Sequence, residues 1–138
     1  MSRKVYKAVH LCAYLTLIHG IIYGVVKYFM QVETEYGIRP HPQQDVWLST
    51  HVLLSPMLVF AFGMLWQNHI VKMYINAIIK RKSGISLVVI MFLMIITGYL
   101  TQIIYQADWQ NLAGISHAVI GLIFGLIYLI HHFLGRRS

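Results

Sequence analysis

The chain has 138 residues, of which 58% are hydrophobic and 11% are charged, and its formal net charge at pH 7 is +7. Ordinary soluble domains carry about 25% charged residues, so this composition excludes that class and favours one integral membrane domain over residues 1–138. A charge of +7 suggests nucleic acid as a partner, but the placement of the basic residues near the ends of apolar segments argues against it.

Four apolar blocks follow one another along the chain. Each is close to the ~20 residues that an α-helix needs to cross the ~30 Å hydrocarbon core of a bilayer. The blocks are Ala8–Met30, Val46–Ile70, Ser83–Tyr105 and Asn111–Leu134. We therefore predict an all-α, integral membrane four-helix bundle. The first block has no small-residue cleavage site after it, so we expect a retained span and no signal peptide.

The connection between the first two blocks contains Gly37, Pro40 and Pro42, which predict a non-helical, turn-rich loop. Pro56 lies inside the second block, where its ring and its missing N–H predict a kink. Cys12 is the only cysteine, which excludes an intrachain disulfide and a cysteine-bound cluster.

Nine of the eleven basic residues gather at one end of the blocks, and only Lys27 and Arg39 fall at the opposite ends. The nine precede the first block, separate the second from the third, or follow the fourth: Arg3, Lys4, Lys7, Lys72, Lys80, Arg81, Lys82, Arg136 and Arg137. The acidic residues all lie in the other two connections: Glu33, Glu35, Asp45 and Asp108. The positive-inside rule then predicts cytoplasmic N and C termini and a cytoplasmic middle loop, with the first and third loops facing outward.

Eight histidines are the most informative polar residues, because most of them lie inside the apolar blocks. Ionisable side chains in membrane spans by default mark a functional site, although a single histidine can equally well bond two helices together. His117 and His131 are fourteen residues apart in the fourth block. At ~100° and ~1.5 Å per residue they face nearly the same way and lie about 21 Å apart. Two ligands stacked in this way can hold two haems across a membrane.

Each haem then needs a second ligand at a matching depth. His51 lies five residues into the second block and His117 six residues into the fourth, so these two match near the outer surface. His10 and His131 each lie twenty residues from the outer end of their block and match near the inner surface. We therefore predict that His51 and His117 bind an outer haem iron. His10 and His131 would bind an inner one, and bis-histidine ligation leaves no open iron position, which suits electron transfer.

Glycines recur with the same spacing. Gly24 lies fourteen residues after His10, and Gly84 and Gly98 are fourteen residues apart in the third block. Gly121 contributes to a small face on the fourth block. Because glycine lets a flat ring approach the backbone, we predict haem packing at all four glycines. Close helix packing through small residues is the alternative.

The other histidines are less informative. His19 points away from the face of His10 and could contact a partner, bond across helices, or replace His10 as the ligand. His69 and His132 lie at the inner surface, where they could meet haem propionates, a quinone headgroup or water. His41 lies in the outer loop and is expected to be solvated.

The predicted iron ligands form a pattern that takes one histidine from each of the first two blocks and a pair spaced by fourteen residues from the last. These are His10, His51, His117 and His131. In this pattern, over nearly the whole chain, the protein resembles the di-haem cytochrome b subunits of membrane-bound formate dehydrogenases and nickel–iron hydrogenases. The resemblance implies the same ligand pairs, two haem b groups and a multi-pass location in the bacterial inner membrane. It also implies electron transfer between a periplasmic redox partner on the outer face and a quinone (menaquinone or ubiquinone) near the inner haem.

We therefore expect the chain to be a transmembrane electron conduit, surrounded by membrane lipid, that acts as the quinone-linked subunit of an oxidoreductase. Asn76, Ser83 and His132 are candidates for the quinone pocket, because they are polar and lie at the inner surface. Two alternatives remain open: a haem-free structural subunit of a larger complex, and a histidine-based metal or proton transporter. Transporters usually carry acidic residues in the membrane as well, and no Asp or Glu lies inside any block.

Overall fold

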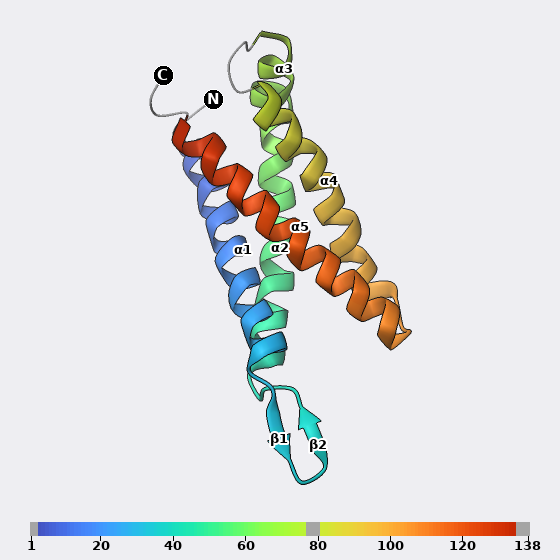
Figure 1. Cartoon of the computed structure of the whole chain (residues 1–138). Coiled ribbons are helices and arrows are strands. Elements are labelled where there is room, and N and C mark those ends of the chain that lie inside the picture. Colours follow the sequence, from blue (N-terminus) through green and yellow to red (C-terminus); the bar gives the residue numbers. More distant parts are fainter. Residues whose placement is uncertain (1–2, 77–80, 135–138) are drawn as a thin grey trace. The chain divides into compact units, whose positions relative to one another are not determined.

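The computed structural model describes residues 3–76 and 81–134. In chain order its elements are α1 (Arg3–Phe29), β1 (Val32–Thr34), β2 (Gly37–Arg39), α2 (Gln44–Leu65), the π-helical segment η1 (Trp66–Val71), α3 (Lys72–Asn76), α4 (Arg81–Ile103) and α5 (Ala107–Leu134) (Figure 1). Three of the basic residues that predict the orientation, Lys80, Arg136 and Arg137, lie outside the described residues.

Within the described residues, four helices are long and apolar enough to cross a membrane: Arg3–Phe29, Gln44–Asn76, Arg81–Ile103 and Ala107–Phe133. This confirms the predicted all-α fold with four membrane-length helices. Large apolar side chains on these helices stay exposed, among them Leu11, Phe60 and Leu126. Water would penalise such surfaces, whereas lipid tails solvate them.

The chain forms two compact units, Met1–Met64 and Leu65–Ser138. The first contains α1, the β1–β2 hairpin and α2, and the second contains η1, α3, α4 and α5. Figure 1 shows that α1 and α2 run antiparallel within the first unit, as α4 and α5 do within the second. The assignment of the whole chain to a single domain stays a prediction.

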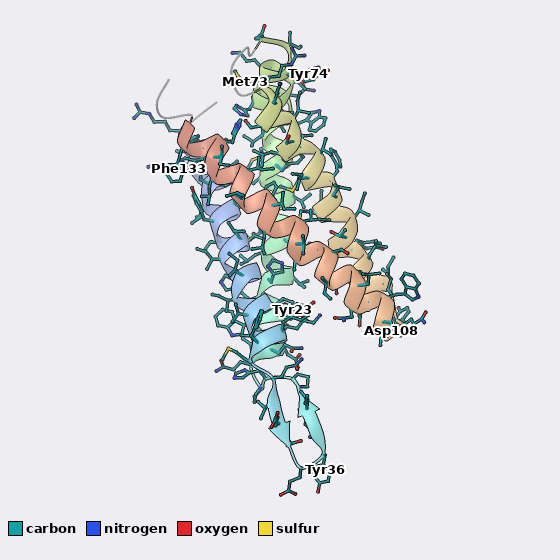
Figure 2. The ribbon with its side chains drawn as sticks, viewed as in Figure 1. Tyr23, Tyr36, Met73, Tyr74, Asp108 and Phe133 are labelled. Atoms are coloured by element: carbon teal, nitrogen blue, oxygen red, sulfur yellow. The ribbon has the colours of Figure 1, made fainter. Side chains whose placement is uncertain are left out.

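A small β-hairpin joins α1 to α2. β1 and β2 pair antiparallel, with Thr34 opposite Gly37 beside the turn and Tyr36 at its tip (Figure 2). The Thr34 hydroxyl donates to the Gly37 carbonyl (2.7 Å) and accepts from the Tyr36 N–H (3.3 Å). Gly37 has a φ of 104°, a left-handed conformation that glycine adopts without a steric cost. The predicted non-helical loop is confirmed, and the two strands are an addition that the sequence did not predict.

The second membrane-length helix is longer than its apolar block. α2 passes through Pro56 without ending, and the predicted kink at this residue stays a prediction. The next six residues, Trp66–Val71, are π-helical and carry His69 before α3 begins. The Trp66 ring packs edge-on against Phe92 of α4, with ring centroids 6.2 Å apart. π-helical turns are rare and often accompany functional sites.

In the second unit, α4 and α5 pack side by side. Small residues allow this approach, because a Cβ added to Gly121 of α5 would lie only 3.3 Å from Cε of Met94 on α4. Residues 104–106 connect the two helices, and the Gln110 side chain donates to the Thr101 carbonyl (3.1 Å) across this connection. Asp108, labelled in Figure 2, lies in the first turn of α5, where a negative charge favours the helix dipole.

Candidate functional site

Both histidines of the fourteen-residue pair contact α4. Oγ1 of Thr97 lies 3.0 Å from Nδ1 of His117, and Oγ of Ser83 lies 2.9 Å from Nδ1 of His131. The two hydroxyl residues are fourteen positions apart on α4, as the two histidines are on α5. At ~1.5 Å of rise per residue, the two hydroxyl–imidazole pairs are therefore separated by about 21 Å along the helices.

Each of these imidazoles also lies against the glycine that follows its hydroxyl partner in the sequence. A Cβ added to Gly98 would be 3.0 Å from Cε1 of His117. A Cβ added to Gly84 would be 3.6 Å from Cε1 of His131. The sequence predicts that Gly84 and Gly98 face a haem ring, and the structure places the imidazole of a predicted iron ligand next to each.

In the first unit, His51 of α2 contacts α1. A Cβ added to Gly20 would lie 2.9 Å from Cε1 of His51, so a side chain at this position would require the ring to shift. Tyr23, labelled in Figure 2, stacks on the same imidazole with centroids 6.4 Å apart. Gly24 is the glycine predicted to pack a haem at this depth; its added Cβ would meet nothing within 4 Å, and its haem role stays a prediction. Sequence reasoning missed Gly20, which lies about one helical turn (~3.6 residues) before Gly24.

Three of the four predicted iron ligands thus lie on a glycine of the neighbouring helix in their own unit. The pairs are His51 with Gly20, His117 with Gly98, and His131 with Gly84. His10 is placed differently, between two tyrosines of its own helix. Its ring centroid lies 4.1 Å from that of Tyr6 and 6.3 Å from that of Tyr14.

The predicted ligand pairs have one member in each unit. His10 and His51 belong to the first unit, and His117 and His131 belong to the second. The pairing of His51 with His117 and of His10 with His131 therefore stays a prediction. The structure shows the contacts that hold each imidazole within its own unit.

The three quinone candidates lie in the second unit. The Asn76 side chain donates to the backbone carbonyl four residues before it (2.9 Å) and is exposed. The His132 ring packs edge-on against Tyr128, with centroids 6.3 Å apart. Ser83 is hydrogen-bonded to His131, which the sequence did not predict, since it associated Ser83 with the quinone alone. The quinone role of all three stays a prediction.

The remaining histidines have separate surroundings. The His19 ring lies 5.5 Å from Trp47, centroid to centroid. Its buried Nδ1 has no hydrogen-bond partner within the described part of the chain. Nδ1 of His41 accepts the backbone N–H of Gln43 (3.2 Å) and so helps to shape the outer loop. The backbone carbonyl of His69 accepts the N–H at the end of the π-helical segment.

Comparison of the chain with protein-family models, with curated proteins and with solved structures finds no match. The chemistry of the chain's own residues therefore has to carry any functional assignment. That chemistry is two imidazoles on one helix face of α5, each held at Nδ1 by a hydroxyl of α4 and each close to backbone at a glycine. Histidine is the commonest metal ligand in proteins, and its non-ligating ring nitrogen commonly has a hydrogen-bond partner.

Proposed function

We propose that this chain is a membrane-spanning di-haem cytochrome b that carries electrons between a redox partner on the outer face and a quinone in the membrane. One observation carries the proposal. α5 presents His117 and His131 fourteen residues apart, and α4 holds both with the same pair of residue types, a hydroxyl followed by a glycine. Two haem irons stacked across a bilayer need two ligands with this separation on one helix.

The donor set fits haem iron. A histidine ligand binds iron through one ring nitrogen and commonly donates a hydrogen bond from the other. His117 and His131 each have Nδ1 in contact with a hydroxyl, so Nε2 would be the ring nitrogen that binds iron. Gly98 and Gly84 allow each ring to lie against α4 without displacement. When bound, the two haem b groups would supply reversible one-electron redox chemistry between the two faces of the membrane.

We assign His51 as the partner ligand of His117 at the outer haem and His10 as the partner of His131 at the inner haem. Two properties of the first unit support this choice. His51 lies on Gly20 in the same way that the α5 histidines lie on their glycines. Gly24, four residues further along α1, leaves open space that a haem edge could fill.

We further propose that both termini face the cytoplasm of a bacterial inner membrane. Arg3, Lys4 and Lys7 begin α1, and Lys72, Arg81 and Lys82 lie around the connection between α3 and α4. Acidic residues lie at the opposite helix ends: Glu33, Glu35, Asp45 and Asp108. This distribution follows the positive-inside rule and directs the β-hairpin outward, toward a periplasmic donor or acceptor. The quinone would then bind near the inner haem, close to Asn76, Ser83 and His132.

A reduced-minus-oxidised visible spectrum of the purified full chain, with a pyridine haemochrome assay for haem per chain, tests the proposal. We expect two b-type haems per chain, and we expect His117→Ala and His131→Ala to remove one haem each. His41→Ala is the matched control, because His41 lies outside the helices, and it should keep both haems. A folded chain that binds no haem overturns the proposal and favours a haem-free structural subunit or a transporter. One haem per chain would mean that one ligand pair is wrongly assigned.

A further inference from the structure

The single hydroxyl group of Thr97 has three hydrogen-bond contacts, the longest of which is to the Met94 carbonyl oxygen (3.4 Å). Its Oγ1 lies 2.7 Å from the Leu93 carbonyl oxygen and 3.0 Å from Nδ1 of His117. A carbonyl oxygen can only accept, so the hydroxyl hydrogen of Thr97 is directed to Leu93. The second bond must therefore run in the other direction, with Nδ1–H of His117 donating to Oγ1 of Thr97.

This direction fixes the protonation pattern of the ring. A neutral imidazole carries one N–H, and in His117 the bond to Thr97 requires that hydrogen on Nδ1. Nε2 of His117 then keeps its lone pair, which is the form that binds a metal. Thr97 thus selects the metal-binding tautomer before any metal is present, and the glycine that follows it allows the ring to come close enough for the bond.

A second hydroxyl–imidazole contact lies fourteen residues earlier on α4. Oγ of Ser83 lies 2.9 Å from Nδ1 of His131, and the residue after Ser83 is again a glycine beside the ring. We infer that Thr97 is a positioning residue that holds His117 as the Nδ1–H tautomer, with Nε2 as the ring nitrogen for iron, and by the parallel contact we extend this inference to Ser83 and His131. The identity of the metal rests on the proposed function, whereas the tautomer is a property of the chain alone.

The hydrogen bond should also influence a bound iron. A hydrogen bond donated by Nδ1–H makes the imidazole a stronger base, and loss of such an outer-shell partner typically lowers metal affinity by about 10–100-fold. A stronger base stabilises oxidised iron more than reduced iron, so Thr97 and Ser83 should lower the midpoint potentials of their haems. If loss of the hydrogen bond weakens the binding of oxidised haem tenfold more than that of reduced haem, the midpoint potential rises by about 59 mV for a one-electron couple.

The tautomer can be measured on the haem-free full chain. Nitrogen NMR of ¹⁵N-histidine distinguishes protonated from unprotonated ring nitrogens, and His117→Gln identifies the His117 signals by their loss. We expect Nδ1–H in the wild-type chain, a shift toward Nε2–H in Thr97→Val, and recovery of Nδ1–H in Thr97→Ser. Thr101→Val is the matched control, because the Thr101 hydroxyl bonds the Gly98 carbonyl (2.7 Å) and should leave the His117 signals unchanged.

The haem-loaded chain gives the second measurement. We expect Thr97→Val to weaken haem binding at one site by about tenfold and to raise that haem's midpoint potential. Thr97→Ser should keep the haem affinity and the midpoint potential close to the wild-type values. Ser83→Ala should weaken the binding of the other haem and raise its midpoint potential. An Nε2–H tautomer in wild-type His117, or an unchanged tautomer in Thr97→Val, overturns the inference even if both haems are bound. A wild-type chain that binds no haem overturns the proposed function instead, and the NMR result then decides this inference by itself.

Discussion

Gly98 and His117 are in direct contact between α4 and α5, and a Cβ at Gly98 would lie 3.0 Å from Cε1 of the imidazole. This distance is shorter than an ordinary van der Waals contact between carbon atoms, which is about 3.5–4.0 Å. A side chain at this position would therefore press on the histidine beside it. Gly20 is closer to His51, whereas Gly84 leaves an ordinary contact distance to His131, and these different clearances lead to a graded prediction.

Alanine substitutions at the three glycines should displace the imidazoles by different amounts, with the largest displacement where the added Cβ lies closest to the ring. The added Cβ would lie 2.9 Å from the ring at Gly20, 3.0 Å at Gly98 and 3.6 Å at Gly84. We expect Gly20→Ala and Gly98→Ala to lower haem content and to cost up to about 1–3 kcal/mol of stability through overpacking. Gly84→Ala should be nearly neutral. Thermal unfolding and haem per chain measure both effects, and a larger loss in Gly84→Ala than in Gly98→Ala would contradict the contact geometry.

Gly24→Ala separates haem packing from protein packing. A Cβ at Gly24 meets nothing within 4 Å and alanine is the better helix former, so the variant should unfold at or slightly above the wild-type temperature. If a haem edge fills this space, the folded variant should nevertheless bind less haem at one site. Gly63→Ala is the matched control, because its added Cβ also meets nothing within 4 Å and no haem is predicted there. Wild-type haem content in Gly24→Ala would remove Gly24 from the haem-packing residues.

Gly37→Ala should loosen the β-hairpin without affecting the helices. Gly37 has a φ of 104°, and an L-residue with a side chain pays roughly 1–2 kcal/mol to adopt a left-handed conformation. Amide hydrogen exchange should accelerate in β1 and β2 while the helices keep their protection. Thr34→Val removes the hydroxyl that bonds the Gly37 carbonyl and should have a smaller effect of the same kind. Unchanged hydrogen exchange in Gly37→Ala would show that the turn has another conformation in the membrane-embedded protein.

Cysteine labelling tests the proposed orientation. In a Cys12→Ser background, Tyr36→Cys places a thiol at the tip of the hairpin, and Met73→Cys places one on α3 (Figure 2). A membrane-impermeant maleimide should label Tyr36→Cys in cells with a permeabilised outer membrane. It should label Met73→Cys only after the inner membrane is disrupted. The reverse pattern would place the termini outside and exchange the inner and outer haems.

The number of helices was predictable because the thickness of a bilayer fixes the length of an apolar block. The residues at which the helices begin and end were less predictable. A helix can continue beyond the hydrocarbon core because its long charged side chains reach the water with their charged groups. α1 begins at Arg3 instead of Ala8, and α5 begins at Ala107 instead of Asn111. The hairpin was missed because its strands have three residues each, too few for a detectable alternation of apolar and polar side chains.

The fourteen-residue spacing predicted haem packing at Gly84 and Gly98 of α4, and this stays a prediction; the structure places an imidazole of α5 beside each of them. The hydroxyl partners were missed, although Ser83 and Thr97 have the same spacing. Serine and threonine in helices usually bond their own backbone, so neither residue stood out. The contact between Gly20 and His51 was missed for another reason. Spacing within one helix says nothing about the level at which a second helix crosses it.

The paired spacing on α4 and α5 also constrains how this gene can change over generations. Deleting one residue between Gly84 and Thr97 would rotate Ser83 by about 100° relative to Thr97, so only one histidine could keep its hydroxyl and its glycine. Substitution of an exposed residue in the same stretch, such as Val89, leaves that rotation intact. The length of this segment should therefore be held constant by natural selection, while much of its outward-facing composition is free to drift.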